Sequence, residues 1–220
     1  MELVAITLAR VVSLVQLQAW DPFGKATSLE TLQGLIDRYT FAKYPTTFDA
    51  LDPQKGIELV EGRLGNIVIH KIAIYSNGLV IDTRSSTDDS ETVLQDMVQL
   101  AHDAFGANIK PVQQNFVSQF IFRSNLRLSA LNPVMGRLGD VLTKKVSTDM
   151  KQVFEFEPTA ISIHTDLSNR KITPAMFSVE RRVDVPFSED TYFSNAPLRT
   201  SDHIEVVNDF EASLLGGNPA

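Results

Sequence analysis

The chain has 220 residues, and its 27 acidic and 20 basic side chains give a formal net charge of −7. Non-specific nucleic-acid binding depends on lysine and arginine contacts to phosphates, so this charge argues against it. There is no cysteine, which excludes disulfide bonds, thiolate metal ligands and a cysteine nucleophile. The hydrophobic fraction of 43% is that of an ordinary folded protein, and the lack of cysteine favours a cytoplasmic location.

The N-terminal tract from Leu3 to Trp20 is strongly apolar and rich in β-branched residues. We expect one long strand that ends at Asp21-Pro22, with an amphipathic helix as the alternative. The tract has no basic leader, because Glu2 comes first, and Arg10 interrupts the apolar run. These features predict neither a signal peptide nor a membrane span. The next periodic segment, from about Ser28 to Tyr39, is predicted to be a short helix.

A set of hairpins followed by a helix is the clearest local pattern. The predicted strands are Ile57–Glu61, Ile67–Ser76 and Leu79–Arg84. Asn77-Gly78 lies between the last two and suits a tight type I′ turn, because both residues tolerate positive φ. The polar string from Ser85 to Asp89 then opens a helix that Gly106 ends.

The second half of the chain repeats this alternation. The predicted strands are Phe116–Ser124, Val153–Glu157, Ala160–Thr165 and Ala175–Val183. Asn132-Pro133 is typical of the start of a helix that ends at Lys144-Lys145, and another helix runs from Thr200 to Gly216-Gly217. The apolar stripe of the first helix is Val134, Leu138, Val141 and Leu142. Gly136 and Gly139 weaken that helix by roughly 1 kcal/mol each. A close approach of the helix to the sheet is the expected reason, with a mobile element as the alternative.

These blocks lack the regular rhythm of a parallel sheet. They predict an α+β fold, with a predominantly antiparallel sheet of six or more strands and about four helices packed mainly on one face. No linker-like segment divides the chain, so residues 1–220 are expected to form a single α+β domain. Its C-terminal tail, residues 216–220, is expected to be flexible.

Two segments without a clear period carry aromatic residues. They are residues 40–56 and Asp184–Arg199. Long irregular segments inside compact domains are uncommon and often functional, and their aromatic residues either cover a sheet edge or contact a partner. The predicted interface residues are Phe187, Tyr192, Phe193, Arg199, Tyr44 and Phe48.

Carboxylates at strand ends support an alternative, a metal-dependent phosphodiesterase or nuclease that uses Mg²⁺ or Mn²⁺. Its candidate catalytic residues are Asp82, Glu155, Glu157 and Glu180. Four histidines (His70, His102, His164 and His203) show no metal-binding spacing and are predicted to be surface or hydrogen-bonded residues. The chain also lacks a phosphate-binding loop and a nucleophile elbow.

The leading interpretation is therefore a non-enzymatic intracellular binding or assembly protein without a metal or cofactor. It would associate with itself through the aromatic residues of these irregular segments, or with another protein. Neither a membrane nor a nucleic acid is expected as its partner. A variant of this interpretation is a ligand pocket lined by Phe116, Phe120, Phe122 and Phe177.

Overall fold

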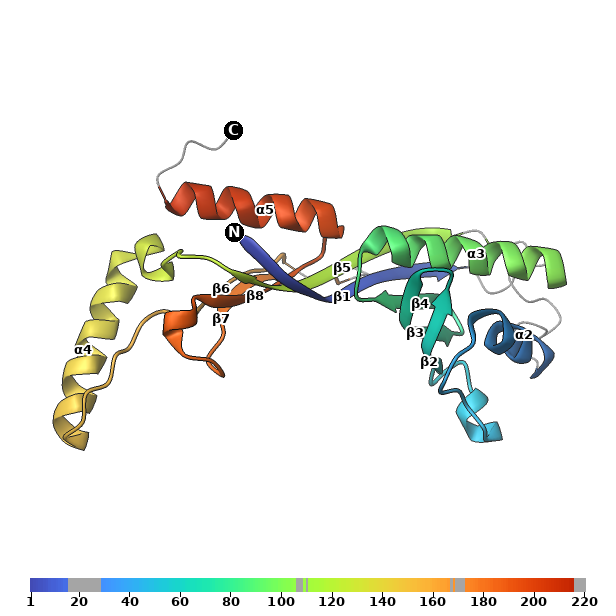
Figure 1. Ribbon diagram of the computed structural model, residues 1–220, viewed down its shortest axis with the longest axis horizontal. Coiled ribbons are helices and arrows are strands. Elements are labelled where there is room, and N and C mark those ends of the chain that lie inside the picture. Colours follow the sequence, from blue (N-terminus) through green and yellow to red (C-terminus); the bar gives the residue numbers. More distant parts are fainter. Residues whose placement is uncertain (16–28, 106–108, 110, 167, 169–172, 216–220) are drawn as a thin grey trace. The chain divides into compact units, whose positions relative to one another are not determined.

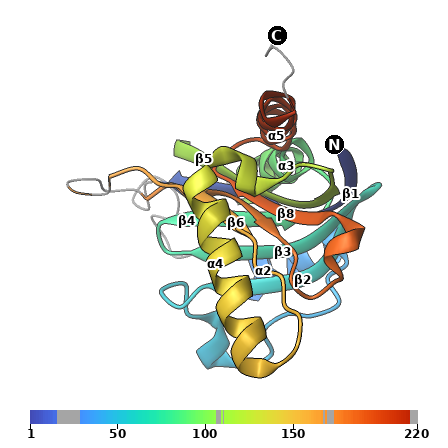
Figure 2. The same cartoon turned by 90° about the vertical axis from the view of Figure 1, so that its left-hand side faces the viewer.

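The computed structural model describes residues 1–15, 29–105, 109, 111–166, 168 and 173–215 (Figure 1 and Figure 2). The strands of this part of the chain are β1 (Glu2–Val15), β2 (Ile57–Leu64), β3 (Ile67–Tyr75), β4 (Gly78–Thr83), β5 (Pro111–Arg123), β6 (Ala160–Ile163), β7 (Phe177–Arg181) and β8 (Thr191–Ala196). Its helices are α2 (Leu29–Tyr39), α3 (Thr87–Phe105), α4 (Pro133–Met150) and α5 (Thr200–Leu214).

The strands form a sheet in the order β2-β3-β4-β1-β5-β8-β7-β6. The pairs β2–β3, β3–β4, β1–β4, β6–β7 and β7–β8 are all antiparallel. The predicted α+β class, with an antiparallel sheet of more than six strands and four helices, is thus confirmed within the described residues.

The chain divides into two compact units. Unit 2 consists of Ile6–Gln119 and Pro197–Ser201, and unit 1 consists of Met1–Ala5, Phe120–Ala196 and Asp202–Ala220. β1 and β5 contribute residues to both units. A single domain over residues 1–220 stays a prediction, and the tail at 216–220 lies outside the described residues.

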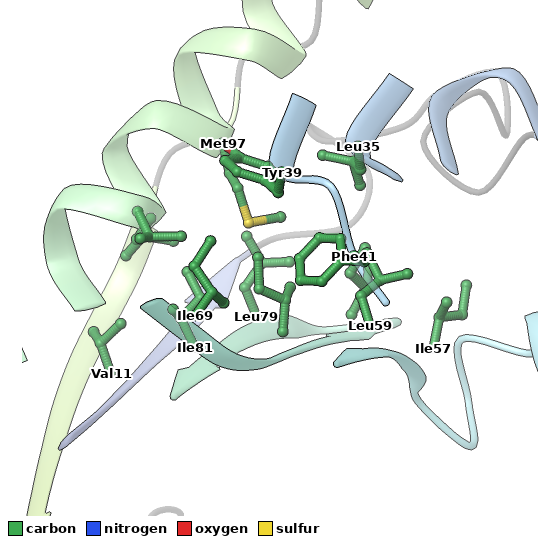
Figure 3. Close-up of a cluster of buried hydrophobic side chains, with 14 of the residues drawn as sticks. Val11, Leu35, Tyr39, Phe41, Ile57, Leu59, Ile69, Leu79, Ile81 and Met97 are labelled. Atoms are coloured by element: carbon green, nitrogen blue, oxygen red, sulfur yellow. The ribbon is translucent and has the colours of Figure 1, made fainter. Parts of the chain in front are cut away.

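The core of unit 2 lies between its strands and two helices. Figure 3 shows Leu35 and Tyr39 of α2 and Met97 of α3 above the side chains of the strands. The strand residues of the same cluster include Val11, Leu59, Ile69, Leu79 and Ile81. Both helices belong to one hydrophobic cluster, so they cover the same face of these strands (Figure 3). Burial of this apolar surface is the main term that stabilises the unit.

A β-bulge lets two isoleucines of β3 face the core of unit 2. The buried Ile69 and Ile72 are three positions apart, whereas strict alternation would place them on opposite faces of the sheet. The register with β4 shifts by one residue between Ile69 and Lys71, and the extra residue keeps both isoleucines on the core face. His70 lies within this irregularity.

The turn between β3 and β4 differs from the prediction by one residue. Tyr75 pairs with Gly78, so Ser76-Asn77 form the two-residue turn and Gly78 begins the strand. Gly78 is needed for a different reason from the one predicted, because a Cβ there would lie 2.6 Å from the Ser13 carbonyl oxygen of β1. The glycine therefore permits a close approach of two strands, and it has no positive φ.

The N-terminal tract is a strand from Glu2 to Val15, as predicted, and its residues 16–20 lie outside the described part. None of the helices among the described residues has the length and apolar character needed to cross a membrane.

Two strand predictions in unit 1 are wrong. The segment Asp184–Arg199 contains a short 3₁₀-helix, Phe187–Glu189, and strand β8. β8 carries no alternating pattern because both of its faces are covered: Tyr192 and Ser194 are fully buried, and Asn195 is buried as well. Residues 153–157 form no strand, and the backbone amides of Phe154 and Phe156 donate to side chains of α4 instead.

The helix boundaries follow the capping residues. Asn132 is the N-cap of α4, where its side chain accepts a hydrogen bond from Val134 N at 2.9 Å and Pro133 begins the helix, as predicted. The predicted end at Lys144-Lys145 is wrong, since α4 continues to Met150 and ends at Lys151 in a left-handed conformation. With this extension α4 has 18 residues and is about 27 Å long.

Candidate interaction surface

The aromatic residues of the Asp184–Arg199 segment have divergent environments. Tyr192 is fully buried, and its hydroxyl donates to Leu126 O at 2.7 Å. Tyr192 therefore belongs to the core of unit 1 and leaves the set of candidate contact residues. Phe193 is half-buried in β8, and Phe187 is 36% exposed.

Phe187 is part of a network around a buried arginine. The Arg181 side chain is only 3% exposed, and its guanidinium lies 4.6 Å from the centre of the Phe187 ring. It donates to Tyr192 Oη at 2.8 Å and to Asp190 Oδ1 at 3.0 Å, and it also pairs with Glu157 at 3.3 Å. These contacts hold the turn that carries Phe187 against β7. One face of the Phe187 ring therefore packs on the Arg181 guanidinium.

Arg199 was predicted to contact a partner, and the structure gives it internal ones. Its Nη1 lies 3.0 Å from Asp88 Oδ1 and 2.8 Å from Glu91 Oε2, and its guanidinium lies 4.0 Å from the centre of the Phe116 ring. Asp88 and Glu91 belong to the first turns of α3, so these acids serve an ion pair as well as the helix dipole.

The aromatic residues of the first irregular segment lie in unit 2. Tyr44 is 46% exposed and lines an open hollow of about 700 Å³ together with residues of α2. Phe48 begins a 3₁₀-helix, and its side chain lies outside the described part of the structure. A contact role for these two residues stays a prediction.

The carboxylates of the metal-dependent alternative have separate environments. Both oxygens of Asp82 accept hydrogen bonds from Arg10, at 2.7 and 2.8 Å. Glu157 pairs with Arg181, Glu180 lies half-buried in β7, and Glu155 is exposed. Among the described residues, no group of three or more histidine, aspartate or glutamate side chains could hold a metal ion. That alternative stays a prediction without a supporting observation in this part of the chain.

Three phenylalanines of the predicted ligand pocket pack against other aromatic rings in unit 1. Phe120 and Phe122 are fully buried, with ring centres 5.8 Å apart. The His203 ring of α5 lies 4.2 Å from the Phe120 ring and 6.2 Å from the Phe177 ring, centre to centre. Phe120, Phe122 and Phe177 therefore pack around His203 within unit 1. A ligand pocket lined by these residues and Phe116 stays a prediction.

Exposed hydrophobic side chains gather in unit 1. Of the 20 large hydrophobic side chains exposed among the described residues, 17 belong to unit 1, and three (Tyr44, Val68 and Val112) to unit 2. Scattered exposed side chains are normal on a monomer, but contiguous apolar patches mark interaction sites. Helix α4 carries six of these exposed hydrophobic side chains: Val134, Met135, Leu138, Val141, Leu142 and Met150.

The side of α4 that contacts the rest of unit 1 is small and polar. The chain after the helix runs back along it, as Figure 1 and Figure 2 both show. Thr143 Oγ1 accepts from Phe156 N, and Ser147 Oγ accepts from Phe154 N, both at 2.9 Å. Gly139 is buried at the same contact, where an added Cβ would collide with the Phe156 carbonyl oxygen.

The apolar side of α4 is exposed. Leu138 is 49% exposed, and the residues three and four positions away in both directions are also apolar and exposed: Val134, Met135, Val141 and Leu142. At 3.6 residues per turn these five side chains form one continuous patch, which we term the Leu138 patch. Around the helix axis Leu138 lies about 100° from Gly139, about 140° from Thr143 and about 180° from Ser147. The usual arrangement, in which the apolar stripe faces the core, is therefore inverted in α4.

The two glycines of α4 provide a test of this arrangement. Gly139→Ala should release the chain from the helix, so that the amides of Phe154 and Phe156 exchange with solvent at least about tenfold faster. Gly136→Ala is the matched control, because the nearest heavy atom to its Cβ would be Ser129 Cβ at 3.9 Å. That variant should stabilise α4 by about 1 kcal/mol. Equal exchange in both variants, measured by mass spectrometry, would contradict the inverted packing.

The sequence predicted four of the five residues of the Leu138 patch, all but Met135, as an apolar stripe, but it did not predict their exposure. The 3.6-residue period shows that a helix has an apolar face, and the expected cover was the sheet. The signal that pointed elsewhere was the line of small and polar residues at 139, 143 and 147, which suits a close backbone contact.

No protein-family model matches the chain, and no curated protein matches it either.

Proposed function

We propose that this chain is a non-enzymatic assembly protein of the cytoplasm, and that two copies associate through the Leu138 patch of α4. The observation that supports the proposal is the exposure of this apolar patch on a helix whose polar side is already covered. Monomeric proteins rarely expose contiguous apolar patches larger than roughly a few hundred Å². Burying such a patch in an interface releases about 25 cal/mol for each Å².

The spacing of the patch favours a second copy as the partner. A two-fold axis through Leu138 would place Val134 opposite Leu142 of the second copy and Met135 opposite Val141. Each pair is apolar, and the patch contains no charged residue. The residues at 134, 138 and 142 form the i±4 ridge that packs most often between helices, with a crossing angle near −50°. The patch is thus complementary to itself.

A charge at the proposed axis should prevent association. Leu138→Glu would bring two carboxylates together in a buried contact, while glutamate preserves the helix. We expect native mass spectrometry to find dimers of the original chain and monomers of this variant, with dimerisation weakened at least about a hundredfold. Val153→Glu is the control, since Val153 is 82% exposed and lies outside α4. This variant should still form dimers.

Mixing two variants makes the test specific for the axis. Leu138→Lys alone should also be monomeric, but an equal mixture with Leu138→Glu should recover dimers, because opposite charges then meet. A monomeric original chain would overturn the proposal. Dimers that persist in both variants would show that association uses another surface, and Phe187→Ser would then test the Asp184–Arg199 segment.

A further inference from the structure

Unit 2 has a hollow of about 470 Å³ at the β2–β3 end of its sheet. It is lined by Thr40, Glu61, Gly62, Arg63, Val68, Ile69, His70 and Arg84. Its volume lies in the range of small-molecule sites, which span about 300–1,000 Å³. All of its lining residues belong to unit 2, so the hollow is complete within that unit.

Within the described part of the chain, the two arginines of the hollow have no carboxylate partner. Unit 2 contains five arginines, and three of them pair with acids: Arg10 with Asp82, Arg38 with Asp96, and Arg199 with Asp88 and Glu91. Among the described residues, Arg63 and Arg84 form no ion pair, and both line the hollow. In a chain with seven more acids than bases, unpaired arginines that gather at one hollow form a specific positive site.

Neighbouring contacts strengthen this positive character. Glu61 is the acid of the hollow, and Lys43 binds its carboxylate at 2.9 Å, which lowers the pKa of Glu61 and offsets its charge. Arg84 Nη2 lies 3.3 Å from His70 Nε2. A guanidinium has no acceptor, so Arg84 donates and His70 accepts, which holds the guanidinium beside the hollow. The β3 bulge places His70 in this position.

Two residues that line the hollow have an unfavourable backbone conformation. Thr40 has φ 50° and Glu61 has φ 60°, the left-handed region that L-residues with side chains seldom adopt. The left-handed conformation costs roughly 1–2 kcal/mol at each position, and a β-branched residue such as threonine adopts it especially rarely. The conformations are held by pairing of residues 42 and 43 with β2, through Ala42 N to Glu61 O and Lys43 N to Val60 O, both at 3.1 Å. Such backbone is concentrated at ligand sites.

We propose that this hollow binds a small organic phosphate, with the guanidinium groups of Arg63 and Arg84 as its anion-binding groups. Guanidinium groups bind phosphate oxygens through paired hydrogen bonds and keep their charge at every physiological pH. Val68, which is 55% exposed, supplies an apolar wall for the organic part. The site belongs to unit 2 and is independent of the Leu138 patch.

Phosphate binding can be measured on the full chain. Titration with inorganic phosphate, followed by amide NMR at constant ionic strength, should give saturable shifts at the residues that line the hollow. Arg63→Gln and Arg84→Gln should each weaken binding about tenfold. Arg137→Gln is the matched control, because this exposed arginine of α4 changes the net charge equally and should leave binding unchanged.

Acetate at the same concentrations is the specificity control, and it should bind at least about tenfold more weakly than phosphate. Absence of saturable shifts up to tens of millimolar phosphate would overturn the proposal. Equal binding of acetate, or equal weakening by Arg137→Gln, would also overturn it, since both indicate a general charge effect. Circular dichroism of each variant confirms that a loss of binding is not a loss of fold.

Discussion

Replacing Arg10 with methionine should destabilise the chain by about 3 kcal/mol, because the variant leaves the Asp82 carboxylate buried without its cation. The Asp82 side chain is 3% exposed, and the two residues lie directly opposite each other on β4 and β1. Hydrogen bonds to Asp82 also raise the pKa of Arg10. We place the loss at the lower end of the range for broken buried pairs, since Arg10 is one third exposed.

Urea unfolding monitored by circular dichroism measures this loss. Arg63→Met is the matched control, because Arg63 is exposed and forms no ion pair among the described residues, and it should change the free energy of unfolding by less than about 0.5 kcal/mol. Adding Asp82→Leu to Arg10→Met should recover most of the stability, because the double variant no longer buries an unpaired carboxylate. A loss below about 1 kcal/mol would refute the structural role of the pair.

The same variants separate the structural role of Asp82 from the metal-dependent alternative. If Asp82 bound Mg²⁺ or Mn²⁺, these ions would raise the melting temperature of the original chain and not that of Asp82→Asn. The hydrogen bonds from Arg10 to both carboxylate oxygens predict no such difference.

Acidification should destabilise unit 1 through His203. This side chain is fully buried, and burial lowers its pKa from 6.5 to about 4. Ser194 Oγ donates its proton to Ser178 O at 2.8 Å, so His203 Nε2 must donate to Ser194 Oγ, also at 2.8 Å. The folded chain thus holds a neutral imidazole with Nδ1 unprotonated. Protonation would add a charge beside the rings of Phe120 and Phe177.

The direction of the pH effect follows from the two pKa values. The unfolded chain binds a proton at His203 near pH 6.5 and the folded chain only near pH 4, so the unfolded state binds more protons in between. The stabilising effect is complete above pH 6.5 and is lost as the pH falls toward 4. The loss between pH 7 and pH 4 amounts to about 3 kcal/mol.

A matched pair of histidine variants isolates this effect from the titration of carboxylates. His203→Gln keeps a donor without a titrating group, so its urea midpoint should depend less on pH than that of the original chain. His164→Gln removes an exposed histidine of unit 1 and should preserve the original pH dependence. If both variants behaved alike between pH 7 and pH 4, His203 would not be the titrating group.

Periodicity predicted most of the fold correctly because it reflects local geometry. Helices α2, α3, α4 and α5 follow from 3.6-residue stripes, and the N-cap Asn132 follows from its side-chain chemistry. β8 was missed because a strand covered on both faces has no alternation, and its buried serine and asparagine resemble loop residues. Residues 153–157 were wrongly predicted as a strand, and the amides of Phe154 and Phe156 donate to side chains of α4 instead.

The candidate sites were less accessible to prediction. Tyr192 and Arg199 were predicted to contact a partner protein, and the structure gives them internal contacts with residues that lie 66 and about 110 positions away along the chain. Arg63 and Arg84 were not singled out, since each is an ordinary surface arginine until the β3 bulge and its neighbours place both at one hollow. Pairings over such distances depend on register, which no short sequence pattern encodes.

The amino-acid sequence alone determined the α+β class, the presence of the four described helices and the existence of an apolar stripe on α4, because each depends on the spacing of neighbouring residues. Only the tertiary structure decided which faces are covered. The Leu138 patch is exposed because backbone amides of residues 154 and 156 bind the opposite side of α4. Burial depends on what packs against a residue, and contacts between distant segments supply that information.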